Sequence, residues 1–188
     1  MDETDLIQRS KTGDVDAFDQ LVGVHQDRVY QLAYRITGNR EDAWDAAQEA
    51  FLKAYRSLRA FRGTAAFSTW LHRVAVNTAL DIVRRRPPQR AQSLEETVVL
   101  TGDDPADQVQ RKDLQRRIHH AIATLPVDHR VVVILRDLEG LAYDEIARTL
   151  QIPIGTVRSR LSRGRDALRM MLADLAPAGG TPQREANG

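Results

Sequence analysis

Residues 143–161 of the chain are YDEIARTLQIPIGTVRSRL. The apolar spacing predicts a short helix over residues 143–150 and a second helix from residue 154, joined by a tight connection. The small Ala147 permits a close helix crossing, and Val157 can pack against the first helix. This spacing is typical of a helix-turn-helix. Gln151 stands where such a turn usually has glycine, so we expect some backbone strain at this position.

The second helix of this motif is predicted to read DNA. A helix-turn-helix presents the N-terminal half of its second helix to the major groove, where arginine bonds guanine and serine bonds either base. Residues 154–171 carry five arginines and one aspartate, a net charge of +4. We predict DNA contacts from Tyr143, Thr156, Arg158, Ser159, Arg160, Ser162 and Arg163. The alternative is a basic amphipathic helix with solvated charges, and for Tyr143 a half-buried scaffold role.

The remaining sequence also has helical spacing, without strand-like alternation or an internal repeat. Helices are expected over residues 4–37 with a break after Gly13, from about residue 41 to 58, and from about residue 68 to 85. Pro87 and Pro88 stop the last of these runs, because proline lacks an N–H donor and disfavours helix at the residue before it.

Residues 87–111 contain proline, glycine and acidic residues with little periodicity, which favours a flexible linker. Within it, the apolar run Val98-Val99-Leu100 is a possible contact with a partner. Helical spacing returns beyond residue 112. The prediction is therefore an all-α protein: two small helical domains (1–86 and 112–174) joined by this linker, the second a helix-turn-helix domain, and a disordered tail (175–188).

Composition and charge exclude several classes of protein. Aromatic residues make up only 5% of the 188 residues, which suits modest helical bundles. No stretch approaches the roughly 20 apolar residues needed to span a bilayer, and the first five residues are acidic, unlike a signal peptide. The absence of cysteine excludes a disulfide framework and a thiolate metal site. We expect a soluble cytoplasmic protein without cofactor, metal or membrane insertion.

Charge is unevenly distributed although the net charge is only +1. Residues 1–27 carry seven acidic and two basic residues, whereas residues 84–90 carry four arginines and no acid. With the basic helix near the C-terminus, this makes two separated basic patches, which is typical of nucleic-acid binding.

Three stretches of the N-terminal half carry a family resemblance. Residues 42–56 are DAWDAAQEAFLKAYR, and residues 61–63 and 67–81 are FRG and FSTWLHRVAVNTALD. They resemble the second conserved region of extracytoplasmic-function (group IV) sigma factors, and residues 125–165 resemble the fourth. The resemblance covers about residues 5–86 and 112–172. It implies an alternative sigma factor that binds core RNA polymerase and directs promoter-specific initiation at -10 and -35 elements, usually held inactive by an anti-sigma factor.

The resemblance also implies roles for single residues. The helix with Asp45, Gln48, Glu49 and Leu52 would dock on the clamp helices of the largest polymerase subunit, where acids beside an apolar residue suit a basic coiled coil. The melted -10 element would be held by Phe61, Arg62, Phe67, Trp70, Asn77, Arg84, Arg85 and Arg86, because aromatic rings stack on bases and arginines neutralise phosphates. The alternatives are a solvated helix face for the acids and a core position for Phe67 and Trp70. Trp44 departs from the family, which usually has a polar or acidic residue there.

Two other functions are alternatives to a sigma factor. An ordinary DNA-binding regulator would use only the C-terminal motif and would need a dimerisation or sensory domain, of which the N-terminal half shows no sign. It would bind promoter DNA alone, whereas a sigma factor requires core polymerase. An enzyme such as a nuclease is disfavoured because the five histidines lack ligand spacing and pair with no carboxylate cluster.

Overall fold

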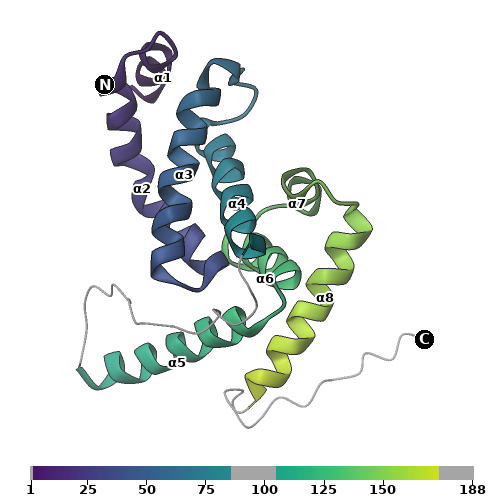
Figure 1. Ribbon diagram of the computed structural model, residues 1–188. Coiled ribbons are helices and arrows are strands. Elements are labelled where there is room, and N and C mark those ends of the chain that lie inside the picture. The colour runs from purple at the N-terminus through teal and green to yellow at the C-terminus, as the bar shows by residue number, and fades with distance from the viewer. Residues whose placement is uncertain (1, 86–104, 174–188) are drawn as a thin grey trace.

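The chain folds into two helical bundles, seen in a computed structural model that describes residues 2–85 and 105–173 (Figure 1). The N-terminal bundle contains α1 (Glu3–Lys11), α2 (Val15–Thr37), α3 (Arg40–Ser57), the 3₁₀ turn η1 (Leu58–Ala60) and α4 (Phe67–Arg85). The C-terminal bundle contains α5 (Pro105–Thr124), α6 (Val127–Val133), the π-helical turn η3 (Ile134–Leu138), α7 (Tyr143–Leu150) and α8 (Ile154–Met171). No strand occurs in these two ranges, and the predicted all-α fold is confirmed.

Local sequence signals set the ends of α2 and α3. The Asp14 side chain caps α2 by accepting a hydrogen bond from the Ala17 N–H at 3.0 Å, and Asn39 caps α3 by accepting from the Asp42 N–H at 3.0 Å. The Ala17 N–H, together with Arg9, holds the pKa of Asp14 below its usual value. Gly38 ends α2 in the left-handed conformation at φ 71°. The helix breaks predicted at Gly13 and Gly38 thus occur where expected.

Alanines on α3 hold the N-terminal bundle together. The side of α3 that faces α2 and α4 is lined by small buried residues: Ala43, Ala46, Ala47, Ala50 and Ala54. Small side chains let the helix backbones approach closely, so the larger residues of α2 and α4, such as Leu32 and Leu71, fill the core between them.

The C-terminal bundle has its core on α6 and η3, where Val131 to Leu135 are at most 2% exposed. Helix α8 crosses α6 at Gly164, a buried position without a side chain. A Cβ atom at Gly164 would lie 2.7 Å from Cγ2 of Val133, which is closer than side chains pack. Glycine is therefore required there by the close approach of the two helices.

Helix α5 begins at Pro105, inside the segment that the sequence predicted to be linker. Proline suits the first turn of a helix, because its missing N–H is one of the donors that has no helical partner. By its sequence context alone, this proline counts among the residues of the linker. The apolar run at residues 98–100 and the C-terminal tail lie outside the described residues.

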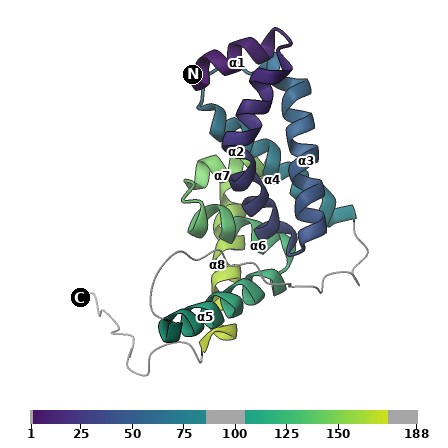
Figure 2. The same ribbon diagram turned by 90° about the vertical axis from the view of Figure 1, so that its left-hand side faces the viewer.

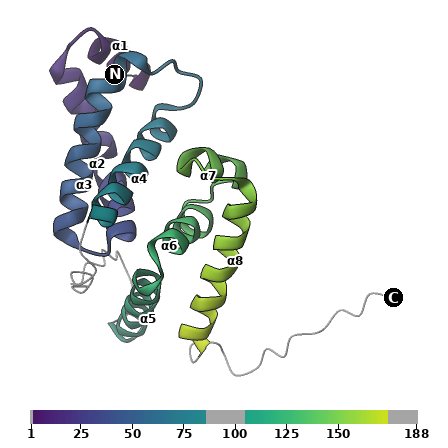
Figure 3. The same cartoon turned by 45° about the vertical axis from the view of Figure 1, so that its right-hand side comes forward.

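The two bundles pack against each other. Helices α5 and α6 lie against α2, and α7 lies against α4, while α8 is on the far side of the C-terminal bundle (Figures 1 and 3). Turned by 90°, Figure 2 places α6 and α7 beside α2 and α4, and α5 across the end of the molecule. The sequence did not predict this contact between the domains.

Candidate functional site

The helix-turn-helix forms as predicted from α7 and α8. Ile146 of α7 and Val157 of α8 are fully buried where the two helices meet. Gln151 lies in the left-handed region at φ 54° and is the one non-glycine residue of the described chain with positive φ. The backbone strain expected at this position is therefore confirmed. The following Ile152 N–H donates to the Ala147 carbonyl at 3.1 Å, which closes the turn.

Helix α8 exposes four of the predicted DNA-reading residues: Arg158, Ser159, Ser162 and Arg163. The Ser159 hydroxyl donates to the carbonyl of Thr156, which is half-buried. Among the described residues, neither Arg158 nor Arg163 has an ion-pair partner, whereas Arg165 and Arg169 pair with Asp137 and Asp166. Two exposed cations of α8 are thus available to an anionic ligand. Helix α8 itself lies on the side of the C-terminal bundle away from the N-terminal bundle (Figure 3).

Two predicted DNA contacts of this domain occupy other environments. Arg160 is only 23% exposed, and its guanidinium pairs with Asp128 of α6 at 2.8 Å. It lies on the side of α8 that faces α6, away from the exposed side chains of Arg158 and Arg163, and its contact with DNA stays a prediction. Tyr143 is half-buried, with the Arg136 guanidinium 5.1 Å from its ring centre, as in the scaffold role left open for it.

Phe61, Phe67 and Trp70 form an aromatic cluster at the start of α4. Their ring centres are 5.2 to 5.8 Å apart, and the His25 ring lies 5.4 Å from Phe67. Phe67 is 3% exposed and Phe61 is 9% exposed, so both rings are buried here, Phe67 in the core position left open for it. Their contact with the -10 element stays a prediction. Only Trp70, which is half-buried, retains an accessible edge.

The polar residues predicted for the -10 element do lie on the surface of the N-terminal bundle. Arg62 is exposed in the loop between η1 and α4, and Asn77, Arg84 and Arg85 are exposed along α4. Arg84 lies 3.4 Å from Asp128 of the other bundle. Arg86 is outside the described residues.

A groove of about 960 Å³ runs between α2 and α3, on the side away from α4. Gln48 and Leu52, two of the four residues predicted to dock on polymerase, line it, and Leu52 is 51% exposed. Asp45 is exposed beside them, and Glu49 lies 3.7 Å from Lys53. The structure therefore brings Gln48 and Leu52 to one surface but leaves the two acids at its margin.

The sequence interpretation missed most of this groove. Its apolar floor contains Trp44, 58% exposed and 5.5 Å from Tyr30 between ring centres, and the Phe18–Tyr55 ring pair. Asp19 and Asp27 add acidic charge, and no lysine or arginine is among its described lining residues. Residues 44, 48, 51, 52 and 55 follow helical spacing on the face opposite the buried alanines, a signal that could have identified this second apolar side.

Comparison with known proteins gives the same division of the chain. Residues 21–87 match the family described as Sigma-70 region 2, and residues 115–168 match Sigma-70, region 4. The RNA polymerase sigma-H factor of Pseudomonas aeruginosa is 41% identical over 90% of this chain and 93% of its own. The chain belongs to the sigma factors of RNA polymerase. Two relatives place it in the extracytoplasmic-function (ECF) group. The ECF RNA polymerase sigma factor SigW of Bacillus subtilis is 38% identical over 90% of this chain and 96% of its own. The ECF RNA polymerase sigma-E factor of Escherichia coli K12 is 40% identical over 87% of this chain and 90% of its own.

Solved structures agree on the fold of this sigma factor. A structure of CnrH in complex with the cytosolic domain of CnrY has a TM-score of 0.61 at 25% identity, covering 92% of this chain and 97% of the other. The sigma factor RpoE of Bartonella quintana, in complex with the anti-sigma factor NepR, also has a TM-score of 0.61, at 22% identity over 83% and 96%. The second likeness concerns the fold alone.

This sigma factor acts with RNA polymerase in promoter recognition and transcription initiation. The region 2 match begins inside α2 and covers α3 and α4, and the region 4 match covers most of the C-terminal bundle. None of the helices in the described residues is long and apolar enough to cross a membrane.

Proposed function

We propose that three surfaces of this sigma factor have separate roles in transcription initiation. The α2–α3 groove docks on core RNA polymerase, the exposed side of α4 and the preceding loop hold the melted -10 element, and α8 reads the -35 element. The observation that carries this assignment is the chemical contrast between an acidic, apolar groove and the cations Arg158 and Arg163, which have no ion-pair partner among the residues that the structure describes.

The groove has the chemistry of a protein-binding surface. Exposed aromatic residues beside acids suit a helical partner that is apolar and basic, and aromatic anchors dominate the energies of such interfaces. DNA phosphates would be repelled by Asp19 and Asp27. An anti-sigma factor that covered this groove would compete directly with core polymerase.

The -35 assignment rests on α8. Its first residues follow Pro153, and no side chain caps the helix there, so the positive end of the helix dipole remains open to an anion. Arg158, Ser159, Ser162 and Arg163 follow within three turns and are exposed. Backbone phosphate contact at the helix start and base contact by these side chains fit a recognition helix.

We also propose that the protein is not an enzyme. It would act in the cytoplasm, because the chromosome and polymerase of a bacterium lie there. The experiment is run-off transcription with purified core polymerase on a promoter library, with and without the protein. We expect promoter-specific transcripts only with the protein. The separate modules should bind duplex DNA weakly, because polymerase must fix their spacing.

A charge reversal tests the docking surface. The double change Asp45→Lys and Glu49→Lys should weaken association with core polymerase in a titration. The control Asp166→Lys changes an exposed acid on α8 and should leave core affinity unchanged. Nanomolar binding of one promoter by the chain without core would favour the ordinary DNA-binding regulator instead.

A further inference from the structure

A buried carboxylate joins the two bundles. Glu139, just after η3 in the C-terminal bundle, has a side chain that is only 8% exposed. Its Oε1 accepts a hydrogen bond from Nη1 of Arg35 at 2.6 Å, and its Oε2 lies 4.0 Å from both Nη2 of Arg28 and Nδ1 of His72. All three partners belong to α2 and α4. A single acid of one domain is therefore surrounded by nitrogen groups of the other.

Two further contacts lie at the same boundary. Arg130 of α6 is 8% exposed and donates to the Ile36 carbonyl in the last turn of α2 at 2.8 Å. Asp128 pairs with Arg84 of α4 at 3.4 Å and with Arg160 of α8 at 2.8 Å. One carboxylate thus engages a cation predicted for the -10 element and a cation predicted for the -35 element.

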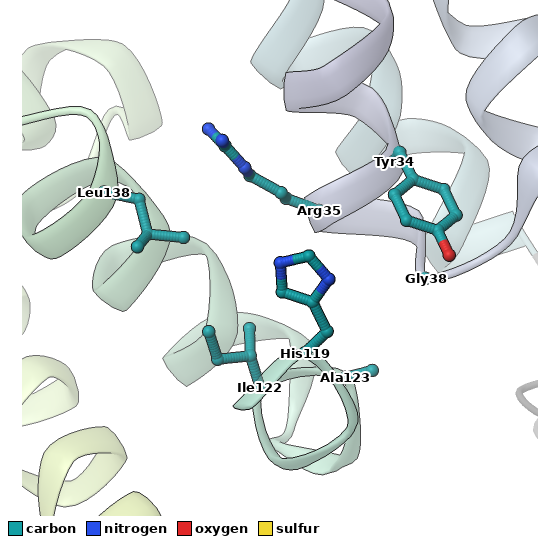
Figure 4. Close-up of a pocket in the computed structure, with 7 residues that line it drawn as sticks. All are labelled: Tyr34, Arg35, Gly38, His119, Ile122, Ala123 and Leu138. Carbon is teal, nitrogen blue, oxygen red and sulfur yellow. The ribbon is translucent and has the colours of Figure 1, made fainter. Parts of the chain in front are cut away.

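Packing around Arg35 is close. Figure 4 shows Arg35 and Tyr34 of α2 facing His119, Ile122 and Ala123 of α5 and Leu138 of η3, around a cavity of about 20 Å³. Such a cavity has room for about one water molecule. The carboxylate of Glu139 is 8% exposed, whereas Arg35 is 34% and Arg28 is 65% exposed, so the charges are only partly shielded from solvent.

The closed arrangement brings the helix-turn-helix domain beside the start of α4. Thr64, Thr69 and Arg73, at the loop before α4 and on its first turns, share a cleft with Glu145 and Arg148 of α7. The described residues assigned to the melted -10 strand are not in this cleft, and those with polar side chains remain exposed. We expect the two domains to separate when both engage one promoter.

We propose that Glu139 is a clasp that holds the free sigma factor closed, through its contacts with Arg35, Arg28 and His72, and that it is released when the domains separate on polymerase. The closed state is a property of this chain and needs no second protein. The consequence for transcription rests on the function proposed above, whereas the clasp itself does not.

The absence of cysteine allows a direct measurement on the full chain. Gln20→Cys on α2 and Met170→Cys on α8, both at exposed positions, accept spin labels or fluorophores on opposite sides of the boundary. Interdomain distance distributions are then compared for the labelled chain and for the same chain carrying Glu139→Gln. The matched control Asp144→Asn removes an exposed ion pair with Arg148 inside one domain.

Glu139→Gln should raise the ratio of open to closed molecules by about tenfold or more. Loss of a fully buried ion pair would have a larger effect, but Arg35 and Arg28 are partly exposed. Asp144→Asn should leave the distribution unchanged. The exchange Arg35→Glu with Glu139→Arg should restore closure relative to either single change, which separates the ion pair from general loss of folding. Circular dichroism confirms folding of each variant.

An unchanged distribution in Glu139→Gln, or a free wild-type chain that is already open, overturns the clasp. Association with core polymerase provides the second readout, and Glu139→Gln should bind core faster than wild type. If neither the wild type nor any variant bound core polymerase, the proposed function would be wrong. The distance measurement would still show whether Glu139 holds the two domains together.

Discussion

The two domains present opposite kinds of surface although both are small helical bundles. The N-terminal bundle packs α3 through alanines and leaves aromatic and aliphatic side chains such as Trp44 and Leu52 exposed on its other side. The C-terminal bundle also exposes some apolar residues, such as Met170, but its helix α8 carries exposed cations, of which Arg158 and Arg163 have no ion-pair partner in the described chain.

The contrast shows how one chain binds two kinds of partner. An exposed apolar groove gains free energy when another protein excludes water from it. Unpaired arginines gain from phosphates and base edges, and this gain depends strongly on salt. The predictions below test this contrast, in decreasing order of expected effect.

Replacing Trp44 by alanine should reduce affinity for core polymerase by about 2 kcal/mol, or ~30-fold, as expected for an aromatic anchor. The side chain is 58% exposed, so the folded domain should retain its stability. Titration of labelled core measures the affinity. The control Met170→Ala removes an apolar side chain that is 83% exposed on the other domain and should have no effect. Equal affinities for all three proteins would exclude the groove as the docking site.

Two glycine-to-alanine substitutions should change the free energy of unfolding in opposite directions. Gly164→Ala places a Cβ atom 2.7 Å from Val133 and should destabilise the C-terminal bundle by about 1–3 kcal/mol. Gly23→Ala, on the exposed side of α2 with no atom within 4 Å of the new Cβ, should instead stabilise its helix by about 0.5–1 kcal/mol. Urea unfolding measures both. A destabilised Gly23→Ala variant would contradict this account of the helix packing.

The two kinds of arginine should differ in their effect on specificity. Arg158→Ala should cost about 1–3 kcal/mol and relax the preference at one or two -35 positions. Arg85→Ala should lower binding at all promoters and reduce the salt slope by about one unit. Transcription from a randomised -35 library at two salt concentrations distinguishes the two. If Arg158→Ala weakened every sequence equally, its contact would be with phosphate.

Acid should weaken the domain interface. Burial lowers the pKa of His72, with Glu139 opposing and Arg28 adding to the effect, and burial and Arg35 lower the pKa of His119. The unfolded chain then binds more protons than the folded chain as pH falls below about 6.5, so stability is present above that pH and is lost below it. The urea midpoint should be lower at pH 5.5 than at pH 7.5. The variant His72→Gln should show a smaller difference between the urea midpoints at the two pH values. If the difference equalled that of the wild type, groups other than His72 would cause the pH dependence.

The smallest effect is expected at the helix-turn-helix connection. Gln151 has φ 54°, which glycine adopts without the Cβ penalty. Gln151→Gly should therefore stabilise the C-terminal bundle by about 0.5–1 kcal/mol, partly offset by the greater freedom of glycine in the unfolded chain. Thermal unfolding measures the change, with Gln20→Gly in α2 as a control that should destabilise.

The sequence by itself determined the helical class, the positions of the main breaks and the helix-turn-helix. These features depend on local chemistry: glycines at Gly13 and Gly38, cap residues at Asp14 and Asn39, and helical spacing of apolar residues. It also predicted the strained Gln151 and the outward arginines Arg158 and Arg163, because helical periodicity assigns each residue to a face.

Tertiary structure decided which faces meet. Burial of Phe61 and Phe67, the pairing of Arg160 with Asp128, and the apolar groove beside Trp44 all depend on neighbours from other helices. The contact of Glu139 with Arg35, 104 residues away in the chain, is the clearest case. Helical spacing shows that a charged residue faces one side of its own helix, but only the packing of the two bundles determines whether that side meets water or an opposite charge.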